Sequence, residues 1–147
     1  GDFYFESYMI QDEDLKEGDL RLLTVDNPLV IPANRNVQIL ITAGDVLHSW
    51  AVPSMGLKTD AVPGRLNETW VNVKEPGIYR GQCSEICGSG HGFMPVVVKV
   101  LPEREFMAWA NEAKNNYAIN EDIEINKSEE EIVISQNNII QLEENNL

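Results

Sequence analysis

Long apolar runs are absent from this sequence. A membrane-spanning helix needs about 20 consecutive apolar residues, and no stretch of the 147 residues approaches that length. We therefore expect a soluble chain, whose 43% hydrophobic residues are enough for the core of one domain with some residues to spare. The chain begins at glycine without the pattern of a signal or transit peptide, although either can be removed during processing.

Basic residues are few. The sequence has 11 lysines and arginines against 24 aspartates and glutamates, which gives a net charge of −13. This balance argues against binding to nucleic acid or to an anionic membrane surface, and it favours a basic partner. The acidity is concentrated towards the end, because residues 103–147 contain 11 acidic and 3 basic residues.

Cysteine and histidine are also scarce. The two cysteines, Cys83 and Cys87, are four residues apart, and the two histidines are His48 and His91. A disulfide between the cysteines would close so short a loop that it would restrict the unfolded chain little. Two cysteines alone would leave the redox compartment open. With histidine nearby, metal ligation is the better interpretation of the pair.

Short strands separated by turns are expected over residues 1–101. Between them, the segment 45–67 is rich in glycine and proline and is interpreted as short strands joined by turns. Residues 37–42 are almost continuously apolar, which predicts a strand buried on both faces. About eight or nine strands in all indicate a mostly β domain, an antiparallel sandwich or barrel. The individual strands are expected at 3–9, 20–25, 29–31, 37–42, 68–73, 78–82 and 95–101.

The pattern changes after residue 101. Pro102 is tolerated in a first helical turn, and Phe106, Trp109, Ala110 and Ala113 share one helical face, so a C-terminal helix is expected over 102–117. Residues 118–147 are acidic and rich in asparagine, with apolar clusters too sparse for a core. We interpret them as an acidic tail that is disordered alone or docked on a partner.

Residues 81–95 bring together most of the metal-binding side chains. Cys83, Cys87, His91 and Met94 lie at intervals of four, four and three residues. Four glycines make a regular helix costly in this stretch, so it is expected to form a loop that folds its donors towards one point. Thiolate, imidazole and thioether form a soft ligand set, which suits copper better than calcium or magnesium.

A single copper site needs one thiolate, two imidazoles and a weak axial donor. His48 can supply the second imidazole, but two thiolates are then one too many for one copper. The set suits two coppers bridged by both sulfurs, with one histidine on each metal and the backbone carbonyl of Glu85 as a further weak donor. Zinc bound by Cys83, Cys87, His91 and His48 is an alternative, but it leaves Met94 without a role.

Two segments carry a family resemblance. DVLHSWAVPSMGLKTDAVPGRLN and GQCSEICGSGHGFMP closely resemble the copper-A domain of cytochrome c oxidase subunit II, particularly its mitochondrial form. The similarity spans about residues 3–110. It implies a cupredoxin-like Greek-key β-barrel or sandwich. Carried across by position, the ligands of the binuclear copper centre would be His48, Cys83, Cys87, His91, Met94 and the carbonyl of Glu85.

The resemblance also implies a function. An electron-entry subunit of the oxidase would accept electrons from cytochrome c and pass them to haem a in subunit I, without reducing oxygen itself. The carboxylate of Glu85 would help to bind magnesium at the interface with subunit I. Asp26 and Asp45 match acidic positions at which basic cytochrome c docks. The expected location is the intermembrane-space side of the mitochondrial inner membrane, or the periplasmic side in a bacterium.

The chain departs from the family in two respects. The family has two membrane helices before this domain, together with the tryptophan through which electrons enter, and the present sequence starts after them. Either the chain is a soluble fragment or the membrane hairpin is a separate polypeptide of a split subunit II. The acidic tail is also longer than the family's usual ending. It would be a docking arm in a split subunit.

Two other copper-binding families share part of this residue pattern. The copper-A domain of nitrous oxide reductase usually has an aromatic residue where Glu85 stands. A copper chaperone of the Sco type also pairs two cysteines with one histidine. Its thioredoxin-like fold alternates strands with helices, however, and its histidine comes far downstream of the cysteines.

Overall fold

The computed structural model describes residues 4–117, which form strands and turns followed by a single α-helix. Seven strands are present in this part of the chain, fewer than the eight or nine expected. Three short 3₁₀ turns, at Asp12–Asp14, Pro53–Met55 and His91–Phe93, connect or flank them. The strands are β1 (Leu29–Pro32), β2 (Val37–Ile41), β3 (His48–Val52), β4 (Leu57–Ala61), β5 (Asn67–Val71), β6 (Gly77–Gln82) and β7 (Pro95–Leu101), and the helix is α1 (Glu103–Tyr117).

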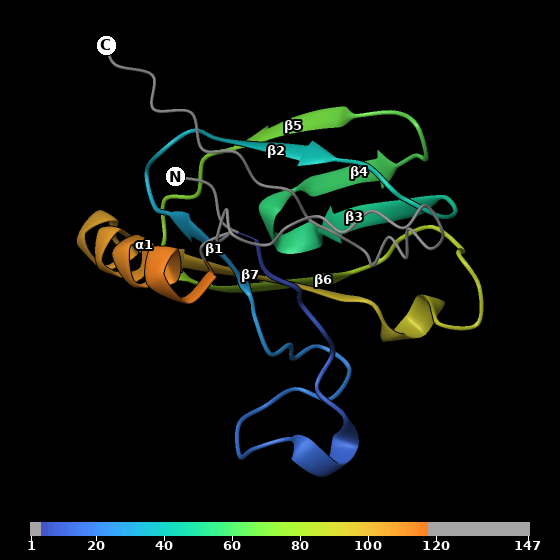
Figure 1. Cartoon of the computed structure of the whole chain (residues 1–147), viewed down its shortest axis with the longest axis horizontal. Helices are drawn as coiled ribbons and strands as arrows, with labels where there is room; N and C mark the ends of the chain where they lie inside the picture. The colour runs from blue at the N-terminus through green and yellow to red at the C-terminus, as the bar shows by residue number, and fades with distance from the viewer. Residues whose placement is uncertain (1–3, 118–147) are drawn as a thin grey trace, which may run out of the picture.

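The strands form three small sheets arranged as a sandwich (Figure 1). In the first sheet the order is β1-β7-β6, with β1 parallel and β6 antiparallel to β7. The other two sheets are the antiparallel pairs β2–β5 and β3–β4. No closed barrel forms among the described residues, so of the two architectures expected, the sandwich is the one found. The mostly β, cupredoxin-like fold with a C-terminal helix is confirmed.

Alternation of side chains along the strands builds the core between the sheets. In β2 the odd-numbered residues, from Val37 to Ile41, are buried and the two between them are half-buried. The expected burial of this strand on both faces is therefore wrong, since its second face is only partly covered. β3 differs because all five of its residues are buried. This strand carries His48 at its first position, so the histidine is held by a fully packed element.

The two strands expected at 3–9 and 20–25 do not form. Of the segment 4–9, only Met9 pairs with another strand-like residue, in an isolated bridge to Val25. The segment is held by scattered hydrogen bonds instead. Asn27 Nδ2 donates to the carbonyl of Glu6, Asp26 N donates to the carbonyl of Tyr8, and Tyr4 N donates to the carbonyl of Tyr117 at the end of α1. Residues 20–23 form a turn, in which Leu22 has a φ of 64° and cannot continue a strand.

Helix α1 confirms the helix expected at 102–117. The carbonyl of Pro102 accepts the first bond, from Phe106 N, and Phe106 and Ala113 are buried against the sandwich. Arg35, in the turn between β1 and β2, forms an ion pair with Glu103 in the first turn of the helix. No helix in the described part of the chain combines the length and apolar character that a bilayer crossing requires. The acidic tail expected at 118–147 lies outside the described residues.

Candidate metal centre

The starts of two strands and the end of a third converge on one region. His48 is the first residue of β3, Cys83 follows β6 directly, and Met94 immediately precedes β7. The loop between Cys83 and Met94 is closed at its base, because Cys83 N donates to the carbonyl of Met94 at 3.0 Å. Ser84 N donates to the carbonyl of Ser49 at 2.9 Å, which ties the loop to β3.

Within this loop the chain reverses at Gly88. Its φ of 130° lies in the region that glycine alone adopts readily. His91 N donates to the carbonyl of Gly88 at 3.1 Å, and a 3₁₀ turn then carries His91 back towards the cysteines. The expectation of a folded-back loop rather than a helix is met.

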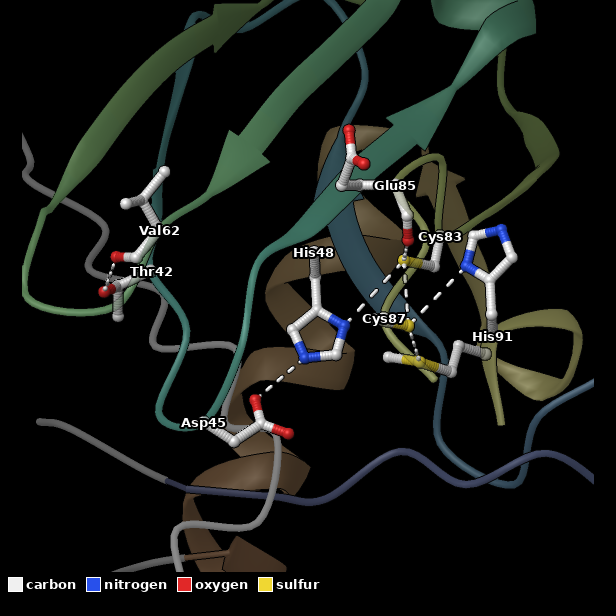
Figure 2. Close-up of polar contacts among 9 residues, drawn as sticks. Thr42, Asp45, His48, Val62, Cys83, Glu85, Cys87 and His91 are labelled. Atoms are coloured by element: carbon white, nitrogen blue, oxygen red, sulfur yellow. Dashed lines mark hydrogen bonds and ion pairs between the residues drawn. The ribbon is translucent and has the colours of Figure 1, made fainter. Parts of the chain in front are cut away.

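The sulfur and nitrogen atoms of the loop meet those of His48 (Figure 2). The two Sγ atoms of Cys83 and Cys87 are 3.8 Å apart. His48 Nδ1 lies 3.8 Å from the sulfur of Cys83, and His91 Nδ1 lies 3.6 Å from the sulfur of Cys87. Each sulfur therefore has an imidazole nitrogen within 4 Å, and His91 interacts with the sulfur of Cys83 as well.

Two weaker donors complete the set. Met94 Sδ is 3.5 Å from Cys87 Sγ, and the carbonyl oxygen of Glu85 is 3.3 Å from Cys83 Sγ. One weak donor again accompanies each thiol. Even without the weaker donors, three residues could hold a metal ion. The donor atoms of His48, Cys83 and Cys87 all lie within 4.8 Å of one another. The donors present thus fit a soft metal such as copper.

Burial differs between the two halves of this cluster. His48 and Cys83 are buried, with exposed fractions of 8% and 9%. Cys87, His91 and Met94 are half-buried, and the carboxylate of Glu85 is exposed. In Figure 2 this carboxylate points away from the sulfurs, whereas the carbonyl of the same residue faces Cys83. The inner half of the cluster is fixed by β3 and the outer half reaches the surface.

Comparison with known proteins shows the family of the chain. The family model of the cytochrome c oxidase subunit II periplasmic domain matches residues 1–101. The chain belongs to this family.

Solved structures agree with the assignment. The crystal structure of the periplasmic domain of subunit II of cytochrome oxidase (CoxB) of Bradyrhizobium japonicum is 46% identical, with a TM-score of 0.72, over 79% of this chain and 80% of that one. A second structure holds the mixed disulfide intermediate between the thioredoxin-like TlpAs and subunit II of cytochrome c oxidase. It is 43% identical, with a TM-score of 0.68, over 79% and 78% of the two chains.

The two thiols of this subunit II domain have opposite acidities. Burial alone would raise the pKa of Cys83, but hydrogen bonds from the backbone of Glu85 and Ser49 and from the two histidines lower it to about 6. The pKa of Cys87 is raised, first by burial and then by its neighbour Cys83. The first thiolate therefore forms readily and opposes the second. A metal cation that neutralises both is needed before both are deprotonated near neutral pH.

The metal-free domain should accordingly show two separate thiol titrations. We expect the ultraviolet absorbance of a thiolate to appear with a midpoint of about pH 6, and to rise a second time at a pH above the usual titration range of a cysteine. Because the pKa of Cys83 is lower in the folded than in the unfolded chain, this thiol stabilises the metal-free fold at high pH, and that contribution is lost as the pH falls towards 6. Cys83→Ser should remove the first rise. A single rise near pH 9 for both thiols would contradict this assignment.

The two aspartates expected at a docking surface have different environments. Asp26 Oδ1 accepts hydrogen bonds from the backbone N–H groups of Tyr8 and Asn27, both at 2.7 Å. Asp45 Oδ1 lies 2.8 Å from His48 Nε2. The contact between Asp45 and His48 was not predicted from the sequence, although a spacing of three residues across a turn was a signal for it. The hydrogen bond with His48 is the main cause that lowers the pKa of Asp45.

Proposed function

We propose that this domain is the electron-entry module of cytochrome c oxidase, which accepts electrons from cytochrome c at a binuclear copper-A centre and passes them to haem a in subunit I. One observation carries the proposal. The two thiols lie 3.8 Å apart, and each has an imidazole nitrogen and a weak donor within 4 Å. With the two sulfurs shared, the arrangement offers one imidazole and one weak donor to each of two metal ions.

The proposed ligand roles follow these contacts. Cys83 and Cys87 would bridge the two ions, and His48 and His91 would each bind one of them. Met94 and the carbonyl of Glu85 would be the weaker donors to the two ions. Two copper ions held by these residues would supply a centre for the transfer of single electrons.

The protein's own contribution is to hold these donors still. The closed base of the loop at Cys83 and Met94, the bond from Ser84 to β3 and the packing of β3 restrict movement of the ligands. A preformed set of ligands on a rigid scaffold limits the reorganisation that opposes electron transfer. The fold would thus favour fast electron transfer, and it would not have to make or break covalent bonds.

The outer half of the cluster suits an interface with subunit I. His91 is half-buried, and the apolar side chains of Ile86 and Phe93 in the same loop have exposed fractions of 82% and 55%. Exposed apolar side chains around a functional site favour a protein partner. We propose that subunit I covers this face, with the exposed carboxylate of Glu85 helping to bind magnesium there. The domain would then lie on the outer side of the mitochondrial inner membrane or in the bacterial periplasm.

The competing families are less suitable. A Sco-type chaperone requires a thioredoxin-like fold, whereas the described residues have a single α-helix, and it comes after all the strands. The family model that matches residues 1–101 is that of oxidase subunit II. Zinc remains the metal to be distinguished from copper by measurement.

Electron transfer from reduced cytochrome c tests this function. After loading with copper, the domain should be reduced by cytochrome c in a second-order reaction that slows as salt is added, because charges further apart than about 10 Å are screened at 0.1 M salt. Asp26→Asn keeps an oxygen for its two backbone partners but removes the charge, and it should slow the reaction about two- to threefold at low salt. Stopped-flow absorbance of the haem measures both effects.

Glu75→Gln provides the matched control. Glu75 lies in the turn before β6, at the opposite end of that strand from Cys83, and its loss removes the same charge. Cytochrome c should reduce the Glu75→Gln variant at the same rate as the unmodified domain, within experimental error. If the rate of reduction changed neither with salt nor in Asp26→Asn or Glu75→Gln, this result would count against cytochrome c as the electron donor.

A further inference from the structure

Asp45 lies on the side of His48 that faces away from the sulfurs (Figure 2). Its Oδ1 is 2.8 Å from Nε2 of the imidazole, while Nδ1 of the same ring is 3.8 Å from Cys83 Sγ. The imidazole therefore spans the distance between a carboxylate and a thiol. The histidine side chain is 11% exposed and that of Asp45 is 58% exposed. The carboxylate thus reaches this buried ring from the surface.

This geometry determines which nitrogen carries the proton. A neutral imidazole has one N–H group and one lone pair, and a carboxylate can only accept a hydrogen bond. In the neutral ring, Asp45 at Nε2 therefore holds the proton on that nitrogen, and Nδ1, which faces Cys83, is left to bind a metal ion. A histidine that binds a metal through one nitrogen commonly donates the other N–H to a carboxylate in this way.

The second histidine lacks such a support within the described part of the chain. His91 Nδ1 lies 3.6 Å from Cys87 Sγ, but among residues 4–117 its Nε2 has no hydrogen-bond partner. Only one of the two imidazoles is thus oriented from within the domain. The asymmetry matches the burial, because His48 is in the packed strand β3 and His91 is in the outer loop.

We propose that Asp45 is a positioning residue for the metal centre, which fixes the tautomer and ring orientation of His48 so that Nδ1 faces the sulfurs before any metal arrives. The effect on copper binding rests on the proposed function. The position of the proton on His48 is a property of the metal-free chain. This role distinguishes Asp45 from Asp26, whose carboxylate accepts hydrogen bonds only from backbone amides. The charge of Asp45 at a docking surface would then be its second role.

Nitrogen-15 NMR of the metal-free protein tests the structural part. The chain has only two histidines, so the imidazole region contains two spin systems, and His91 is an internal reference. We expect His48 to show a proton on Nε2 that exchanges slowly with water. In Asp45→Ala this exchange should become at least tenfold faster, in Asp45→Asn the amide oxygen should restore most of the protection, and His91 should be unchanged in both variants.

Copper affinity tests the consequence. Loss of a carboxylate behind a ligating histidine typically weakens metal binding about 10- to 100-fold, so Asp45→Ala should bind copper more weakly by that factor. Asp45→Asn should recover most of the affinity, and Glu75→Gln, which removes a charge elsewhere, should leave it unchanged. Competition with a copper chelator measures the ratio.

Two results would overturn the inference. In one, Asp45→Ala matches the unmodified protein in both Nε2–H exchange and copper affinity, and only its reaction with cytochrome c is slower. In the other, the alanine and asparagine variants are impaired equally, which would make charge rather than hydrogen-bond geometry the cause. A chain that binds no copper would instead remove the proposed function, while the exchange measurement would still decide the role of Asp45.

Discussion

Replacing Cys83 or Cys87 with serine is expected to abolish the paired-copper spectrum of the oxidised domain. Both sulfurs are within 3.8 Å of each other and of one imidazole each, so each would bridge both ions. A serine hydroxyl stays protonated near neutral pH and is a harder donor than a thiolate, which makes it a poor bridge between copper ions. Copper should fall from two ions to about one or none per chain.

Metal analysis together with electron paramagnetic resonance measures this loss. Ser84→Ala is the matched control, because Ser84 lies in the same loop with an exposed side chain and contributes its backbone N–H to the bond with Ser49. That variant should keep both coppers and the shared spectrum. If a cysteine variant kept two coppers with one electron shared equally between them, the bridging role of that sulfur would be wrong.

Gly81→Ala is expected to disrupt the fold itself. A Cβ atom at this position would lie 1.7 Å from the carbonyl oxygen of Ala51 and 2.9 Å from Val52 Cα, and both contacts are with backbone. Since neither neighbour can rotate away, β6 and β3 would have to separate. Overpacking costs up to about 3 kcal/mol and occasionally more, a large part of the roughly 5–15 kcal/mol that stabilises a domain.

Separation of β6 and β3 in Gly81→Ala would also disturb the metal centre. β6 leads to Cys83 and β3 begins with His48, so separating these strands moves a thiol away from its imidazole. Denaturant unfolding should show a much lower midpoint for Gly81→Ala, or the protein should be recovered only as aggregate. Gly90→Ala is the control, since a Cβ there meets nothing within 4 Å and its φ of −83° suits alanine. Equal midpoints for the two variants would contradict the close approach of the strands.

Residue type and spacing were sufficient to predict most of the candidate site. The soft donors of the loop are rare side chains, and four of them within residues 83–94 leave few alternative interpretations. His48 could be added because the chain has one other histidine only. Strand β7 and helix α1 were also predicted closely, since an apolar run between two prolines and a helical apolar face are both local patterns.

Contacts between distant residues explain what the sequence did not reveal. Residues 4–9 are aromatic and alternate like a strand, yet their backbone partners come from Asp26, Asn27 and the end of α1. No local pattern indicates these partners. The approach of β6 to β3 at Gly81 is likewise set by the packing of two sheets, so that glycine could not be distinguished from the other nine.

Copper content combined with electron paramagnetic resonance on the oxidised, unmodified domain tests the central proposal most directly. We expect two coppers per chain and one unpaired electron with equal hyperfine coupling to both nuclei, because each ion has one imidazole, two bridging sulfurs and one weak donor. A single copper with a one-metal spectrum would contradict the bridged centre. Zinc in place of copper would contradict the electron-transfer function itself.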